Sequence, residues 1–293
     1  MQQPENSAAG YSYAVAAYTF WGIAPIYFMA VAFAAPLEIL ANRIAWSIPL
    51  LAALVLIGRQ WRTVLTLDRR AFAGLALCAV LLSVNWLTFI YGILAGRIAE
   101  TSLGYFLNPL VSIALGTLLL RERMRPWQWT AVALAGFGIG FELATVGSLP
   151  WVALVLALTF GLYGLVRKKL MLPAALSLGI ETLYLLPLAL GFLYLAELPA
   201  HTTREQGLLA LGGVITVLPL VWFGAAAVRL KLTTLGFIQY LAPSLSLVIA
   251  VWLYGEQITP VRWFSFGMVW LSILLYSAEG LWWQRRALGG VRV

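Results

Sequence analysis

Three polar side chains inside one strongly apolar stretch of the sequence could bind a charged solute. The stretch EILANRIAWS contains Glu38, Asn42 and Arg43. A guanidinium at membrane depth costs about 2.5 to more than 10 kcal/mol, so it is retained where it faces a cavity or has a partner. Two interpretations of Arg43 stay open: it binds an anionic group of a substrate, or it pairs internally with Glu38, with Glu181 or with a neighbouring carbonyl.

Two prolines near the middle of other apolar stretches predict interruptions in helices. Pro109 and Pro243 cannot donate a backbone hydrogen bond, and each frees the carbonyl four residues earlier, that of Tyr105 or Gln239. In a membrane, a freed carbonyl must face protein or a water-filled cavity. We therefore predict that both prolines act as hinges beside a cavity, the alternative being that they are packing kinks only.

Amide and aromatic side chains cluster around the same prolines and in the neighbouring apolar stretches. Such groups suit an amphipathic organic solute and are poor ligands for a metal, although each aromatic ring could equally serve helix packing or an interfacial belt. The predicted substrate-binding residues are Glu38, Asn42, Arg43, Asn85, Trp86, Tyr105, Asn108, Tyr163, Glu181, Gln239 and Tyr240.

The sequence has no arrangement of residues typical of an enzyme or a metal site. The only histidine, His201, falls in a predicted external loop, and no pair of carboxylates is placed in mid-membrane. There is no nucleotide-binding loop and no nucleophile–base pair. We expect no cofactor, no metal and no catalysis.

The elements that must position these residues are membrane-spanning helices. Of the 293 residues 62% are apolar and only 10% are charged, whereas a soluble domain has about 25% charged residues. Runs of about 20 apolar residues, enough to cross a bilayer, recur along the chain. The predicted spans are residues 11–34, 36–57, 71–94, 98–120, 126–145, 150–169, 176–196, 208–228, 232–254 and 260–283. The fold class is therefore an all-α membrane protein embedded in a lipid bilayer.

The distribution of basic residues predicts the orientation. Fifteen of the 19 Lys and Arg residues fall in loops on one side of the membrane, and three fall on the other. Cytoplasmic loops carry the excess of positive charge, so both termini are predicted to be cytoplasmic. A net charge of +8 would suggest nucleic-acid binding in a soluble protein; here topology accounts for it, and we expect no nucleic-acid partner. The sequence indicates no oligomeric state.

Two apolar segments repeat each other. SLGYFLNPLVSIALGTLLLRERM and TLGFIQYLAPSLSLVIAVWLYGEQI share a proline and a glutamate, Pro109 with Pro243 and Glu122 with Glu256, at a common spacing of 134 residues. We interpret the two glutamates as structural caps. The chain then divides into two five-helix units, residues 1–145 and 146–293, and because five is odd the second unit must be inverted. A weaker similarity matches Glu38 with Glu181.

Further motifs extend the comparison to the whole chain. AAYTFWGIAPIYF, EILANRIAWS, NWLTFIYG, ETSLGYFLNPL, LLRER, TFGLYGLVRKK, IETLYLLPLAL and TTLGFIQYLAPSL together resemble the RarD-like branch of the EamA family, in the drug/metabolite transporter superfamily. The resemblance implies ten helices in two inverted repeats, a central cavity, and transport of small molecules across the bacterial inner membrane.

These features favour a secondary transporter that exports small amphipathic metabolites or drugs by alternating access. Glu38 or Glu181 could carry protons if transport is coupled to a proton gradient. Two alternatives are a non-transporting membrane scaffold or accessory protein, and an intramembrane enzyme. The repeated mid-membrane prolines argue against the scaffold, and the lack of a catalytic constellation argues against the enzyme.

Overall fold

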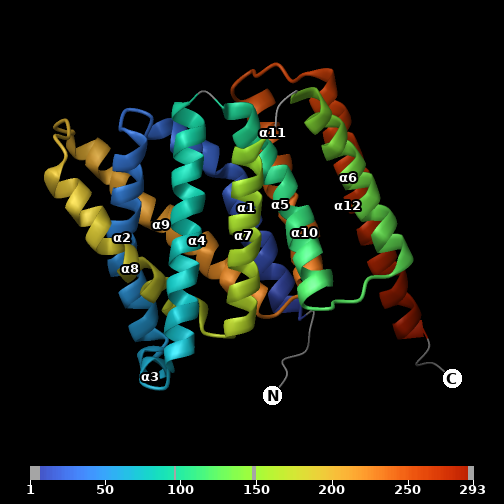
Figure 1. The fold of residues 1–293 in the computed structure, drawn as a ribbon, viewed down its shortest axis with the longest axis horizontal. Coiled ribbons are helices and arrows are strands. Elements are labelled where there is room, and N and C mark those ends of the chain that lie inside the picture. Colours follow the sequence, from blue (N-terminus) through green and yellow to red (C-terminus); the bar gives the residue numbers. More distant parts are fainter. Residues whose placement is uncertain (1–6, 96, 147–149, 290–293) are drawn as a thin grey trace.

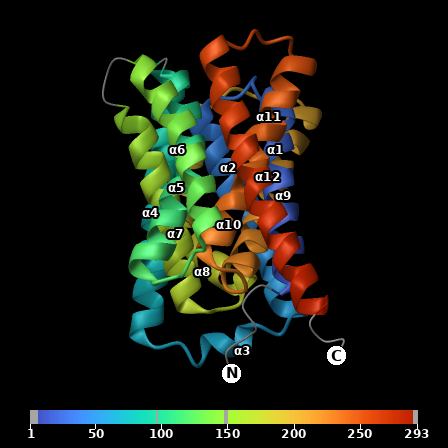
Figure 2. The same cartoon turned by 90° about the vertical axis from the view of Figure 1, so that its right-hand side faces the viewer.

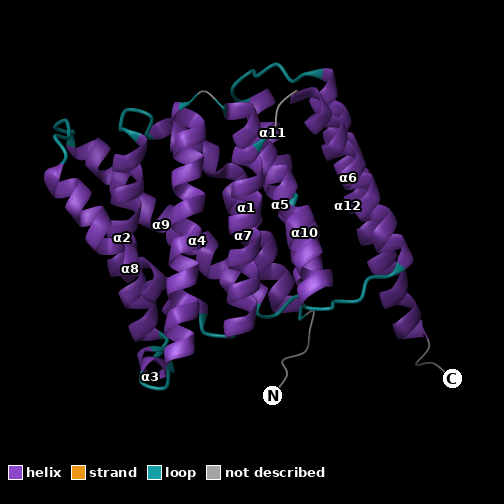
Figure 3. Ribbon diagram, viewed as in Figure 1, coloured by secondary structure: helices purple, strands orange, loops and turns teal. Residues whose placement is uncertain are grey.

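The protein is a bundle of helices joined by short loops. The computed structural model describes residues 7–95, 97–146 and 150–289, and these residues contain helices and loops only (Figure 3). The helices are α1 (Ala8–Ala30), α2 (Pro36–Ile57), α3 (Trp61–Val64), α4 (Arg69–Leu94), α5 (Ile98–Leu119), α6 (Pro126–Val146), α7 (Trp151–Leu170), α8 (Ala174–Leu195), α9 (Thr203–Ala227), α10 (Leu232–Gln239), α11 (Leu241–Trp252) and α12 (Pro260–Gly289).

Local sequence signals explain several helix ends. The carboxylate of Asp68 accepts a hydrogen bond from the amide of Ala71 at 2.8 Å and caps α4. Thr202 and Glu205 form a reciprocal capping box at the start of α9. Pro36 opens α2, where its missing amide proton costs nothing.

The helix lengths confirm the membrane fold. In the described part of the chain, nine helical segments are long and apolar enough to span a bilayer, counting α10 and α11 as one. The tenth predicted span is α6, a helix of 21 residues packed along α12. Boundaries differ from prediction by a few residues: α9 begins at Thr203, five residues early, because of its capping box. Helix α3 was not predicted.

The helices form a flattened bundle with two distinguishable ends. Helices α2 and α8 lie at one edge and α6 and α12 at the other (Figure 1). Helix α3 lies across one end, which we call the α3 end, and α1 starts and α12 finishes at the same end (Figures 1 and 2). The α2–α3, α5–α6 and α9–α10 loops, which carry arginines in the sequence, also lie there (Figure 1).

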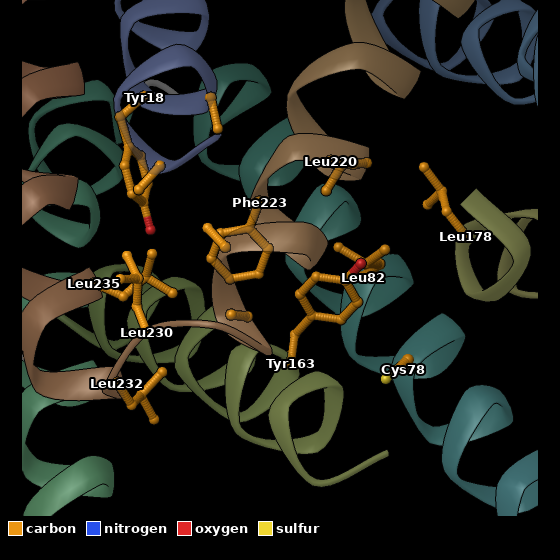
Figure 4. Close-up of a cluster of buried hydrophobic side chains, with 14 of the residues drawn as sticks. Tyr18, Cys78, Leu82, Tyr163, Leu178, Leu220, Phe223, Leu230, Leu232 and Leu235 are labelled. Atoms are coloured by element: carbon orange, nitrogen blue, oxygen red, sulfur yellow. The ribbon is translucent and has the colours of Figure 1, made fainter. Parts of the chain in front are cut away.

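The core is packed between helices far apart in sequence. Tyr18 of α1, Cys78 of α4, Tyr163 of α7 and Phe223 of α9 belong to one buried cluster (Figure 4). The rings of Tyr163 and Phe223 stack with centroids 5.8 Å apart. This cluster ties the α1–α4 half of the chain to the α7–α9 half and holds the polar groups described below in place.

The backbone supports the two-repeat organisation. Arg121 and Gly255, 134 residues apart, both have positive φ, 54° and 66°. The next residue of each copy donates its amide to the carbonyl six positions earlier: Glu122 to Gly116 and Glu256 to Ala250, both at 3.0 Å. Two loops of the same shape therefore follow α5 and α11, as expected if these helices are related by the repeat.

The two copies differ at their prolines. Helix α5 runs unbroken through Pro109, whereas its counterpart is divided at Tyr240 into α10 and α11, with Pro243 in the first turn of α11. Gly104 and Pro109 are five residues apart, but Gly236 and Pro243 are seven apart. The two additional residues fall at the break, which explains why a proline alone does not interrupt α5.

Candidate functional site

Arg43 lies among aromatic and hydroxyl groups. Its Nε donates to Oγ1 of Thr216 on α9 at 2.8 Å. Its guanidinium carbon lies 5.3 Å from the ring centroid of Phe28 on α1 and 5.6 Å from that of Trp86 on α4. Among the residues that the structure describes, no carboxylate forms an ion pair with Arg43. The predicted internal pairing with Glu38 or Glu181 is therefore not what the structure shows.

A tyrosine completes this arrangement from α5. Tyr105 lies close to Arg43, and its ring centroid lies 6.2 Å from that of Phe89. Although its neighbours Gly104 and Phe106 are buried, Tyr105 is 48% exposed. We call Phe28, Arg43, Trp86, Tyr105 and Thr216 the Arg43 cluster.

The Arg43 cluster lies in the half of the bundle opposite the α3 end. Arg43 and Tyr105 are each the eighth residue of their helices, α2 and α5, and both helices start at that opposite end (Figure 1). At 1.5 Å per residue this is a depth of about 10 Å. The guanidinium is thus inside the membrane span, where charge is costly.

Gly212 leaves space for the side chain of Arg43. A Cβ atom on Gly212 of α9 would lie 2.7 Å from Cγ of Arg43 and 2.6 Å from the hydroxyl of Tyr27. Only glycine lets α9 approach α2 this closely. Both polar side chains then reach α9, Arg43 through Thr216 and Tyr27 through the carbonyl of Leu208 at 3.2 Å.

A second polar group lies in the half nearer the α3 end. Arg167 of α7 and Glu181 of α8 form an ion pair at 3.4 Å, and each side chain is only 1% exposed. The hydroxyl of Tyr163 donates to the second oxygen of Glu181 at 3.2 Å, and Arg167 also donates to the carbonyl of Ala174 at 3.4 Å. Arg167 was counted among the loop residues that set topology; instead it belongs to the buried interior.

A small cavity of about 10 Å³, room for about one water molecule, borders residues of both polar groups. It is lined by Glu181 and Leu178 of α8, by Trp86 of α4 and by Thr216 of α9, with Ser47 of α2. Trp86 and Thr216 are the same residues that contact Arg43. The cavity therefore borders two residues of the Arg43 cluster and the carboxylate of Glu181.

Three predicted site residues have internal partners. Glu38 is 2% exposed and its Oε1 lies 2.7 Å from Nε2 of His201, in the α8–α9 loop. Asn42 donates to the carbonyl of Glu38 at 3.0 Å, within its own helix. Asn85 donates to the carbonyl of Leu156 and to Oγ1 of Thr159, both at 2.9 Å, and so ties α4 to α7.

The residues predicted around the two prolines come together where α5 crosses α10. Gln239 lies at the break and accepts from the hydroxyl of Ser112 on α5 at 3.4 Å. Asn108 is 5% exposed and Tyr240 is fully buried. Within the described residues, Oδ1 of Asn108 and the hydroxyl of Tyr240 have no hydrogen-bond partner. Buried polar atoms are nearly always satisfied, so a water, a solute or a rearranged helix must supply partners here.

Sequence reasoning missed Phe28, Thr216, Arg167 and the role of His201. Thr216 and Arg43 are 173 residues apart, and no local pattern links them. His201 carried one available signal, as the only histidine in the chain.

Comparison with known proteins identifies similar chains over nearly the full length. The model of the EamA-like transporter family matches residues 8–142. An uncharacterized transporter of Vibrio cholerae is 45% identical over 285 residues, covering 94% of each chain. Protein RarD of Escherichia coli is 42% identical over 293 residues, covering 96% of this chain and 98% of that protein. A protein of known crystal structure, 16% identical, covers 92% of this chain with a TM-score of 0.73 and so has the same fold.

Proposed function

Because the chain belongs to the EamA-like transporter family, we propose that it is a secondary transporter that moves small amphipathic organic solutes by alternating access. It is a multi-pass membrane protein with bacterial transporter relatives. The arginine-rich loops at the α3 end support a cytoplasmic position for that end and for both termini. Export is the direction that we infer from the family resemblance.

The observation that carries this proposal is the unpaired Arg43. A guanidinium within the membrane span is held by one neutral hydroxyl and two aromatic rings. Its two terminal nitrogens have the fork geometry that binds a carboxylate or a phosphate with two hydrogen bonds. The rings of Phe28, Trp86 and Tyr105 suit an apolar or aromatic body attached to that anion.

The predicted site then separates into roles. Arg43, Trp86 and Tyr105 bind the solute, Glu181 lines the small cavity beside them, and Tyr163 donates a hydrogen bond to Glu181. Asn108, Gln239 and Tyr240 flank the crossing of α5 and α10, where Pro109 and Pro243 act as hinges. Glu38, Asn42 and Asn85 position the helices that carry them, since each has an internal partner.

Protons are the coupling ion that we propose, with Glu181 as the carrier in place of Glu38. Glu181 lines the cavity that reaches the Arg43 cluster, whereas Glu38 pairs with His201 beside a loop. Replacing Glu181 by Gln should abolish the dependence of flux on a pH gradient, and replacing Glu38 by Gln should leave that dependence in place. Equal gradient dependence in both variants contradicts this assignment.

The other functions have less support. A scaffold or accessory protein has no use for an unpaired charge in the membrane span, which lowers stability without a ligand. An intramembrane enzyme needs a nucleophile with a base or a metal. The described residues contain no group of three His, Cys, Asp or Glu placed to hold a metal ion.

The test combines a binding screen with flux measurements. Purified protein is screened by thermal shift against organic anions, amino acids and antibiotics, and the solutes that raise its melting temperature are loaded into proteoliposomes. We expect flux that exceeds that of protein-free liposomes and that Arg43→Ala abolishes. The matched control is Arg62→Ala, because Arg62 also stacks on a tryptophan, Trp61, at 5.5 Å but lies at the α3 end. Absence of flux for every solute, or normal flux in Arg43→Ala, refutes the proposal.

A further inference from the structure

A carboxylate from one repeat caps a helix of the other repeat at the α3 end. The two oxygens of Glu122, in the α5–α6 loop, accept hydrogen bonds from the amides of Leu232 and Thr233 at 2.7 and 2.8 Å. These amides open α10, whose own N-cap residue, Lys231, supplies no side-chain cap. Lys168 lies 4.0 Å from the same carboxylate, which is 6% exposed. Glu122 thus caps α10, although the sequence had suggested only a local cap.

The side chain of Glu256, the repeat counterpart of Glu122, has no partner among the described residues. Glu256 has the same spacing to its proline and the same backbone geometry as Glu122, with an amide bonded six residues back. It lies at the opposite end of the bundle, in the α11–α12 loop (Figure 1). Its side chain is exposed, and no hydrogen bond or ion pair joins it to any described residue.

The helix that Glu256 would cap by symmetry receives no cap from the side chain of its N-cap residue. The match of Leu103-Gly104 with Leu235-Gly236 is spaced by 132 residues and places Glu100 and Thr101 of α5 at the positions of Leu232 and Thr233. Arg97, the N-cap residue of α5, makes no side-chain cap hydrogen bond and pairs with Glu100 at 2.9 Å. The amide of Thr101 already donates to the carbonyl of Arg97 at 3.0 Å. The amides left for Glu256 are therefore those before Thr101, at the positive end of the helix dipole, which attracts a carboxylate.

The packing of α5 also differs between the two ends of the bundle. Near the α3 end α5 presses on α10: a Cβ on Gly236 would lie 2.9 Å from the carbonyl oxygen of Pro109, and one on Gly116 would lie 3.1 Å from the amide nitrogen of Thr233. Across the described residues, α5 has no comparable packing against α11. Tyr105, in this part of α5, is 48% exposed.

We propose that Glu122 and Glu256 are paired gating residues, each closing one end of the transporter by capping the first turn of a helix in the other repeat. In the present conformation Glu122 caps α10 and the α3 end is closed. In the alternate conformation Glu122 leaves α10, Glu256 caps α5, and the end opposite α3 closes over the Arg43 cluster. This inference rests on the alternating-access mechanism proposed above.

Glutamates suit this exchange of helix caps because a carboxylate can accept hydrogen bonds from two amides at once. Glutamine has one acceptor oxygen and no charge, so Glu→Gln keeps the size of the side chain and weakens the cap. Loss of one helix cap corresponds to about a fivefold change in the ratio of two states. The variants should therefore shift an equilibrium without unfolding the protein.

The experiment measures the opening of each end by spin-label distances in full-length protein in nanodiscs, without any added solute. One label pair, at Arg123 and Val228, reports on the α3 end, and another, at Ala95 and Trp252, reports on the opposite end. The native Cys78 is fully buried and stays unlabelled. In Glu122→Gln, molecules with a longer first distance and a shorter second distance should become more common. Their ratio to the remaining molecules should rise about fivefold. Adding Glu256→Gln should reverse most of that shift.

Glu197→Gln is the matched control for the second substitution. Glu197 is an exposed glutamate at the same end of the bundle as Glu256, and in the Glu122→Gln background its replacement should leave both distances unchanged. If Glu122→Gln folds and leaves the distances as in the wild type, or if Glu256→Gln behaves like Glu197→Gln, the gating proposal is wrong. Flux in matched proteoliposomes separates the two proposals. Wild-type flux with unshifted variants overturns only the gating residues, whereas absent wild-type flux overturns the transport function itself.

Discussion

Replacing Arg43 by Gln should remove anion binding and leave the protein stable, whereas replacing Arg167 by Gln should do the opposite. Both arginines lie in membrane-spanning helices, but only Arg167 has a carboxylate partner, Glu181, at 3.4 Å. Arg43 has the hydroxyl of Thr216 at 2.8 Å and two aromatic rings. The two substitutions thus apply the same chemical change to an unpaired and to a paired guanidinium.

The expected magnitudes follow from these contacts. Arg43→Gln loses one charged hydrogen bond, about 1.5–3 kcal/mol, and two cation–π contacts of about 0.5–2 kcal/mol each. It also removes a charge whose insertion costs about 2.5–3.5 kcal/mol on translocon scales. The lost contacts add up to about 2.5–7 kcal/mol and the removed charge offsets about 2.5–3.5 kcal/mol, so stability should fall by about 2 kcal/mol at the centre of these ranges. The loss of a charged hydrogen bond to the solute should weaken anion affinity about 10- to 100-fold. Arg167→Gln leaves the buried Glu181 with the hydroxyl of Tyr163 but without its charged partner, which costs about 3–5 kcal/mol.

The assay measures both quantities on the same preparations. Thermal unfolding in detergent without solute reports stability, and the shift produced by the strongest anion of the binding screen reports affinity. We expect Arg43→Gln to melt within a few degrees of the wild type and to show no anion-induced shift. Arg167→Gln should melt well below the wild type and, if it is still folded, keep the shift. A large destabilisation by Arg43→Gln, or anion binding equal to that of the wild type, would refute the assignment of Arg43 as the solute-binding charge.

Four further substitutions test the packing and the site. Gly213→Ala should destabilise the protein by about 1–3 kcal/mol, because its Cβ would lie 2.4 Å from a backbone carbonyl oxygen of α2; Gly136→Ala, with nothing within 4 Å, should melt at or above the wild-type temperature. Asn85→Leu should cost about 1–3 kcal/mol in thermal unfolding, since it removes both donors to α7, and a wild-type melting temperature would contradict this structural role. Thr216→Val keeps the side-chain shape and removes the acceptor of Arg43, so anion affinity should fall about 5-fold or more with little change in melting; unchanged affinity would show that the hydroxyl does not orient the guanidinium.

Hydropathy and spacing were enough to predict the architecture. Each span needs only length and apolar composition, and the 134-residue spacing of Pro109 with Pro243 marks the repeat. The break at Tyr240 was also encoded, in the two additional residues between Gly236 and Pro243. A helix can absorb a proline as in α5, so the insertion decides which copy breaks.

The partners of the polar residues could not be predicted in the same way. Sequence periodicity determines which side chains share a face of one helix, but it does not determine which helix packs against that face. Arg43 therefore could not be assigned to Thr216, nor Glu38 to His201. Arg167 was misplaced because TFGLYGLVRKK ends in three consecutive basic residues, which are typical of a loop. The first of them instead turns inward, where Gly224 leaves space for its guanidinium: a Cβ there would lie 2.4 Å from Nη2.

The positions at which the helices begin change one of the matches between the two repeats. They also explain why the polar group around Arg43 differs from the one formed by Arg167 and Glu181. The sequence had matched Glu38 with Glu181. Counting from the ends of the helices, Glu181 is the eighth residue of α8, as Arg43 is of α2, and each precedes an interior proline, Pro187 or Pro49, by six residues. The two repeats thus carry opposite charges at equivalent depths from opposite ends. In the half nearer the α3 end, the side chain of Glu181 is only 1% exposed and has the partner that Arg167 provides. Arg43 lies beside Tyr105, which is 48% exposed, and a solute anion can take the place of a fixed carboxylate there. A conformational change that opens the α3 end and closes the opposite end would remove water from Arg43 and bring water to Glu181. A bound solute anion would therefore stabilise Arg43 most in the conformation in which the opposite end is closed.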